Sequence, residues 1–248
     1  MSERLRIFVG FEGTLTSVDM TRRMVEEFGD ERLLAQFEVW KRDCCSVPGG
    51  GTVEVAKPLL RSLCDSISTA NLDHFVDCQS VDPTFNDFAC FCADRSIDVS
   101  VLSDGFDYVA GRILRNHGLG TLRVFANALT FEENGNGSNR AVVSFPHDDE
   151  DCRACTLCKR NVVVSQNAED ELIVYIGSSY SDCCVVRYAD VVFARNRLQT
   201  FCQQENITHH VFVTFADVRH KIEQLRSRKR LQKRREAEAN RQTLFRAG

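Results

Sequence analysis

The chain has 248 residues, of which 43% are hydrophobic and 27% charged, and it contains only four prolines. This balance is typical of a folded globular protein and excludes the collagen-like, low-complexity and coiled-coil classes. The net charge of −4 conceals an asymmetry, because residues 219–248 carry eleven Lys and Arg against three Glu. That segment therefore has a net charge of +8, and the rest of the chain has −12.

The first predicted element is a short buried strand over residues 5–11, where apolar and β-branched residues dominate. A turn at Glu12–Thr14 should lead from it into a helix. Residues 19–78 show apolar side chains at helical spacing, interrupted at Pro48–Gly51. This stretch predicts a block of helices without strands.

Strand and helix signals alternate beyond the helical block. The predicted strands cover 98–102, 122–126, 172–177 and 191–193, the predicted helices cover 108–117 and 197–205, and a hairpin-like pair surrounds 133–139. Strands that alternate with helices indicate an α/β fold with a parallel sheet.

Four polar stretches stand where such a sheet binds ligands, beyond the carboxyl ends of its strands. They are Gly10–Thr16, Ser103–Asp107, Lys159 behind a group of cysteines, and Gly177–Asp182. Each alone is an ordinary polar turn. In this order, with a helical block between the first and second, they resemble the haloacid dehalogenase-like phosphatases, and especially the branch with phosphoserine phosphatase and the methylthio-ketopentenyl-phosphate phosphatases.

The resemblance covers nearly the whole chain and implies a particular domain organisation. It implies a three-layer, Rossmann-like α/β core with a parallel sheet over residues 1–16 and 80–218. It also implies an inserted helical cap over residues 17–79. Residues 219–248 would then form a basic C-terminal helix.

The residues of the catalytic motif depart from the family pattern. The family uses an aspartate on the first strand to attack phosphorus, and a second aspartate two residues later as general acid and base. Here Gly10 stands in the nucleophile slot and Glu12 in the acid–base slot. The family's Mg²⁺ site keeps Asp182 as a residual ligand, whereas Ser178 stands in a second ligand slot. Because Mg²⁺ favours carboxylate oxygens, we expect its binding to be weak or lost.

The anion-binding part of the pattern is retained. Ser103 and the backbone amides near Asp104 and Gly105 would lie at a helix N-terminus, which favours phosphate. Lys159 fits the position of the family's phosphate-neutralising lysine, and Thr14 belongs to the same predicted phosphate-binding set. These residues suggest a pseudophosphatase that retains a pocket for a phosphorylated small molecule or serves a protein partner.

An active enzyme is the alternative. A phosphomonoester hydrolase could use Glu12 and a water molecule in place of the missing nucleophile. We prefer the pseudophosphatase, because no phosphoaspartyl intermediate can form on Gly10.

The cysteine group has two interpretations that the sequence leaves open. Cys152, Cys155 and Cys158 are spaced closely enough to bind one zinc ion, but a closed site needs a fourth ligand. That ligand would have to come from His147, Cys183 or Cys184. The same cysteines could instead form a loop that shapes the substrate entrance.

The compartment and the basic tail complete the expectations. The N-terminus lacks the features of a signal peptide, and no apolar run approaches the ~20 residues of a bilayer span, so we expect a cytoplasmic protein with reduced thiols and no membrane helix. A single helix is predicted from about Phe215 to Arg246, with its end projecting into solvent. No aromatic residues for base stacking are interleaved in it, so we do not expect nucleic-acid binding.

Overall fold

The computed structural model describes residues 4–43, 53–65, 67–133, 139–149, 155–168, 170–228 and 231–247. A seven-stranded sheet runs through its centre in the order β4-β3-β2-β1-β5-β6-β7. The strands are β1 (Arg4–Gly10), β2 (Asp98–Phe106), β3 (Arg123–Glu133), β4 (Asn139–Ser144), β5 (Glu171–Gly177), β6 (Val191–Ala194) and β7 (His210–Val211). Every neighbouring pair is parallel except β3 and β4, which are antiparallel. The predicted α/β fold with a parallel sheet is confirmed.

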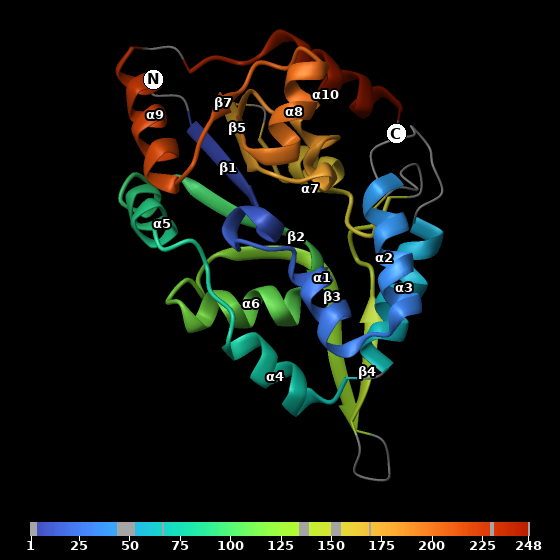
Figure 1. Cartoon of the computed structure of the whole chain (residues 1–248). Helices are drawn as coiled ribbons and strands as arrows, with labels where there is room; N and C mark the ends of the chain where they lie inside the picture. Colours follow the sequence, from blue (N-terminus) through green and yellow to red (C-terminus); the bar gives the residue numbers. More distant parts are fainter. Residues whose placement is uncertain are drawn as a thin grey trace.

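Helices cover both faces of the sheet, which makes three layers (Figure 1). One face packs against α5 (Phe85–Ala93), α6 (Asp107–Asn116) and α9 (Phe215–Ser227), and the other against α7 (Lys159–Ser165) and α8 (Asn196–Gln204). None of the helices in the described ranges is both long and apolar enough to cross a bilayer.

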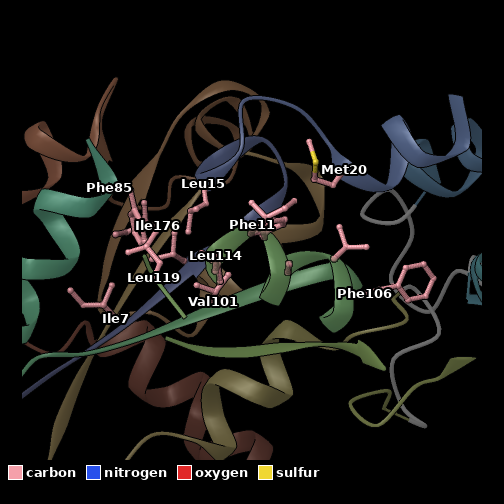
Figure 2. Packing of buried hydrophobic residues seen from close by; sticks show 14 of the residues in the cluster. Ile7, Phe11, Leu15, Met20, Phe85, Val101, Phe106, Leu114, Leu119 and Ile176 are labelled. Carbon is pink, nitrogen blue, oxygen red and sulfur yellow. The ribbon is translucent and has the colours of Figure 1, made fainter. Parts of the chain in front are cut away.

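The central strand β1 is apolar from Ile7 to Val9, where both of its faces are buried. Ile7 and Val9 belong to the larger hydrophobic cluster, whereas Phe8 points to the opposite face and joins the smaller one. Figure 2 shows part of the larger cluster, with Val101 of the sheet close to Leu114 of α6. The alternation of side chains along β1 thus places them in two hydrophobic cores, one on each face of the sheet.

Four helices follow the first strand, as the helical spacing predicts: α1 (Met20–Phe28), α2 (Glu31–Asp43), α3 (Val53–Asp65) and α4 (Thr69–Asp77). Their starts have ordinary physical causes. The Asp19 carboxylate caps α1 by accepting a hydrogen bond from the Arg22 amide, and Ser68 caps α4 in the same way. The predicted interruption at Pro48–Gly51 lies outside the described residues.

The C-terminal segment differs from the single projecting helix that the sequence predicts. Helix α9 ends at Ser227, and a separate helix α10 (Arg235–Ala247) begins after it and lies back over the molecule (Figure 1). Arg241 of α10 is buried and donates hydrogen bonds to the Tyr188 carbonyl and to Asp190 Oδ1, at 2.5 and 3.0 Å. Since the Asp190 side chain is fully buried, it needs a cationic partner, and α10 supplies one.

Candidate functional site

The candidate site lies where β2, β1 and β5 end side by side. Gly10, the last residue of β1, pairs in register with Leu102 of β2. The next residues of β2, Ser103–Gly105, lie where its pairing with β3 shifts register, and they therefore start level with the end of β1. On the other side Thr14 Oγ1 donates a hydrogen bond to Ser178 Oγ at 2.8 Å and joins the loop after β1 to the loop after β5. The structure brings together the following sequence-predicted residues: Gly10, Glu12, Thr14, Ser103, Asp104, Gly105, Lys159, Ser178 and Asp182.

Glu12 is buried, and its carboxylate accepts hydrogen bonds from Ser103–Gly105 near the end of β2. The Ser103 hydroxyl donates to Oε1 at 2.5 Å and the Asp104 amide donates to Oε2 at 3.2 Å. The Gly105 amide donates to Oε1 at 3.4 Å. A negatively charged group therefore already sits on the donors that the sequence assigns to phosphate.

The position of Glu12 changes its protonation. Burial raises the pKa of Glu12 to about 7, and the nearby Asp104 carboxylate adds to the rise. The ammonium groups of Lys159 and Lys41 act in the opposite direction. Glu12 is consequently close to half-ionised at neutral pH, which is the range in which a carboxylate can act as a general base.

Lys159, at the start of α7, is paired with carboxylates inside the site. Its Nζ lies 2.9 Å from Asp182 Oδ1 and 3.5 Å from Asp104 Oδ1, and it donates a hydrogen bond to Ser181 Oγ at 3.0 Å. Burial alone would lower the pKa of Lys159, but Asp104 and Asp182 hold it well above its usual value. Lys159 therefore stays protonated, and the two carboxylates already neutralise its positive charge.

Asp182 also has its oxygens satisfied by the protein itself. In addition to Lys159, Oδ1 accepts a hydrogen bond from the Tyr175 hydroxyl at 2.6 Å. Oδ2 accepts from the amides of Ser178 and Ser179 at 3.0 and 2.9 Å, and from Ser179 Oγ at 3.0 Å. These donors fix the carboxylate tightly, and they occupy the lone pairs that a metal ion would use.

The residues present do not fit the Mg²⁺ that the fold family implies. Gly10 and Ser178 contribute no carboxylate, and Asp182 is bound to an ammonium group where a cation would have to lie. Among the residues that the structure describes, no three His, Cys, Asp or Glu side chains are grouped to hold a metal ion.

Lys41 belongs to the site although no motif in the sequence points to it. It comes from α2, far from the strand ends in sequence, and its Nζ lies 3.1 Å from Asp19 Oδ2 and 3.4 Å from Asp104 Oδ2. The same ammonium lies 4.5 Å from the ring centroid of Trp40. A recess too tight to admit a water molecule lies here and is lined by Trp40, Lys41, Asp104, Cys155 and Ser181.

Asn127 was also missed, but in this case a signal exists. It follows the apolar part of β3, and its Nδ2 donates hydrogen bonds to the carbonyls of Asp104 and Gly105 at 2.7 and 3.0 Å. A polar residue that follows the apolar part of a parallel strand is the same pattern that identified the other positions. Asn127 thereby holds the backbone of Asp104 and Gly105 in place.

The zinc interpretation of the cysteine group stays a prediction. Cys155 and Cys158 are buried in the structure, whereas Cys152 lies outside the described residues. The Cys158 amide donates to the His147 carbonyl at 2.8 Å. The His147 ring packs edge-on against Phe125, and burial lowers the pKa of this histidine.

Comparison with known proteins gives matches over most of the chain. The family model described as Putative Phosphatase matches residues 6–232. A 2-hydroxy-3-keto-5-methylthiopentenyl-1-phosphate phosphatase from Brevibacillus brevis is 27% identical over 220 residues, covering 88% of this chain and 95% of that protein. An enzyme of the same name from Geobacillus kaustophilus is 26% identical over 220 residues, with the same two coverages.

Solved structures show the same fold at lower identity. A phosphoserine phosphatase with a phospho-aspartyl intermediate analogue superposes with a TM-score of 0.61 at 15% identity, covering 86% of this chain and 95% of that one. A phosphoserine phosphohydrolase-like protein from Francisella tularensis gives a TM-score of 0.62 at 14% identity, with coverages of 88% and 99%.

Proposed function

This chain belongs to the Putative Phosphatase family of the haloacid dehalogenase-like superfamily, in its phosphoserine phosphatase-like branch, and we propose that it binds phosphomonoesters without hydrolysing them through a phosphoaspartate. The observation that carries the proposal is the end of β1. Gly10 has no side chain there, and a Cβ at this position would lie 3.2 Å from Asp182 Oδ1. The nucleophile slot thus faces the paired Asp182 carboxylate and contains no attacking atom.

The retained donors support binding. The Ser103 hydroxyl and the amides of Asp104 and Gly105 converge on one place, and the cation of Lys159 lies next to Asp104. Backbone amides and hydroxyls that converge in a buried position are a common way to bind phosphate oxygens. A phosphorylated small molecule is therefore the proposed ligand class.

The helical block is the proposed cap over this pocket. In this division, residues 17–79 form the cap, residues 1–16 and 80–218 form the core, and residues 219–248 form the tail. The ion pair between Lys41 and Asp104 supports the assignment, because it joins helix α2 to the core. Lys57 and Arg61 of α3 lie over the Phe145 ring, with centroid distances of 5.3 and 5.2 Å, and so make a second contact to the core.

Binding and turnover can be measured separately. Calorimetric titration with inorganic phosphate, with and without Mg²⁺, should show binding that does not require the metal. With p-nitrophenyl phosphate as substrate, the native chain should release no more product than the Ser103→Ala variant. This variant is the control, because it should have lost phosphate binding. Mg²⁺-dependent turnover, or an acyl phosphate trapped on the native chain, would contradict the proposal.

One observation favours a second candidate, a hydrolase that uses Glu12 to activate water. The pKa of Glu12 at about 7 suits a general base near neutral pH. Such an enzyme would gain activity as the pH rises through 7, and the Glu12→Gln variant would be inactive while still binding phosphate. A pH profile of phosphate release from both proteins separates this candidate from the first.

A further inference from the structure

The phosphate donors of the site are already engaged by a side chain of the same protein. Both oxygens of the Glu12 carboxylate take part, Oε1 with the Ser103 hydroxyl and the Gly105 amide, and Oε2 with the Asp104 amide. These are the groups to which the proposed function assigns a bound phosphoryl oxygen. A hydroxyl or amide proton directed at Glu12 is not available to a second anion.

The loop that carries Glu12 is fixed, so this contact does not depend on a freely moving side chain. Gly13 adopts a φ of 67°, in the left-handed region that favours glycine, and this turns the chain sharply after Glu12. The Arg195 guanidinium then donates hydrogen bonds to the carbonyls of Gly13 and Thr14, at 3.2 and 2.8 Å. The backbone thus directs the Glu12 side chain at Ser103–Gly105.

The charges around Glu12 disfavour a second anion as long as its carboxylate stays in place. Glu12, Asp19, Asp104 and Asp182 face two ammonium groups, those of Lys41 and Lys159. With all groups ionised, the cluster has a net charge of −2. A phosphoryl dianion that entered this cluster would be repelled at short range in a poorly solvated place.

We propose that Glu12 is a built-in occupant of the phosphate pocket, so that an oxyanion binds only by displacing this carboxylate from Ser103 and the two amides. The inference rests on the proposed function, because it concerns the same pocket. Glu12 is then a specificity-determining residue. It lowers the affinity of the pocket for every oxyanion, and ligands with further contacts to the protein offset this loss.

Sulfate is a suitable probe, because it stays a dianion throughout the pH range in which the protein is folded. Its affinity is measured by calorimetry in slightly alkaline buffer for the native chain and for Glu12→Ala and Glu12→Gln. Glu27→Ala and Glu27→Gln are the matched controls, since Glu27 is an exposed glutamate on α1. Circular dichroism checks that each variant is folded, and Glu12→Gln, which keeps the shape of the side chain, serves if Glu12→Ala unfolds.

We expect Glu12→Ala to bind sulfate at least about tenfold more tightly than the native chain, which is the size of one charge-assisted hydrogen bond. Glu12→Gln should fall between the two, and the Glu27 variants should match the native chain. Adding Ser103→Ala to Glu12→Ala should remove the gain. If the native chain binds sulfate and Glu12→Ala binds it no better, the inference is wrong and the proposed pocket stands. If no variant binds sulfate, the pocket itself is wrong and the inference falls with it.

Discussion

Lys159 and Asp182 form a buried ion pair, with Nζ 2.9 Å from Oδ1 and side chains that are 1% and 0% exposed. The sequence likeness assigns this lysine to phosphate and this aspartate to a metal ion. In the structure they neutralise each other, which leaves the site stable without either ligand. A pair of this kind is costly to break from one side, because the remaining charge stays buried without its partner.

The first prediction concerns this pair. Lys159→Met should lower the free energy of unfolding by about 3 kcal/mol, because Asp182 and Asp104 would lose their shared cation. The double variant Lys159→Met with Asp182→Asn should recover part of the loss. Urea unfolding of both variants and of Asp182→Asn completes a double-mutant cycle. A loss below about 1 kcal/mol for Lys159→Met would mean that the pair behaves like an exposed one.

Restoration of the family's three aspartates is the second prediction. The combined variant Gly10→Asp, Glu12→Asp and Ser178→Asp should hydrolyse p-nitrophenyl phosphate in a Mg²⁺-dependent manner. The new Cβ at position 10 would lie 3.2 Å from Asp182 Oδ1 and 3.4 Å from Thr14 Oγ1, so these neighbours need to move by only a few tenths of an ångström. The shorter side chain at position 12 would also release the Ser103 hydroxyl and the amides of Asp104 and Gly105.

Two control proteins test that result. The double variant Glu12→Asp with Ser178→Asp lacks the nucleophile and should stay inactive. A triple variant that folds yet shows neither activity nor phosphate binding would refute the assignment of Ser103 and Lys159 to the pocket.

The third prediction is a pH dependence of stability that comes from Glu12. Burial raises its pKa from 4.5 to about 7, so folding favours the protonated acid. The stabilisation is fully present below pH 4.5, decreases as the pH rises, and is lost above about 7. The difference in unfolding free energy between the native chain and Glu12→Gln should change over this window by on the order of 3 kcal/mol.

Urea unfolding at several pH values checks this change. The comparison with Glu12→Gln cancels other titrating groups, such as His147 and His210, whose pKa values burial lowers from 6.5. A difference that stays constant with pH would show that the pKa of Glu12 is the same in the folded and the unfolded protein.

The fourth prediction concerns the contact between α10 and the body of the protein. Arg241→Leu should destabilise the protein by about 3 kcal/mol, because the buried Asp190 would keep only backbone amides as partners. Arg235→Leu is the matched control, since Arg235 is exposed on the same helix. Thermal unfolding of both variants decides the matter, and equal melting temperatures would show that α10 contributes no stability through this ion pair.

Much of the fold could be predicted from the sequence because its signals are local. The apolar run of β1 and the alternation of strands and helices beyond residue 98 depend on burial, which leaves a period in the sequence. The clustering of Ser103, Lys159 and Asp182 followed from the rule that parallel strands end at one edge.

The contacts within the site could not be predicted, because they depend on side-chain direction. Nothing in the sequence tells that Glu12 turns towards Ser103, or that Lys159 pairs with Asp182 and not with a ligand. Lys41 resembles any other lysine near the end of a helix until α2 is placed over the site. The folded-back tail was missed for the same reason, since the burial of Arg241 follows from the position of Asp190.

The glycine at the end of β1 affects more than catalysis. Active sites commonly hold like charges close together and lower the stability of the fold in exchange for activity. At Gly10 the chain adds no further carboxylate to Asp182, Asp104 and Glu12, so the like-charge repulsion in the site is smaller than it would be with an aspartate there. The protein thereby gains a thermodynamic margin, with which it can tolerate mutations elsewhere that a fully charged centre would not permit.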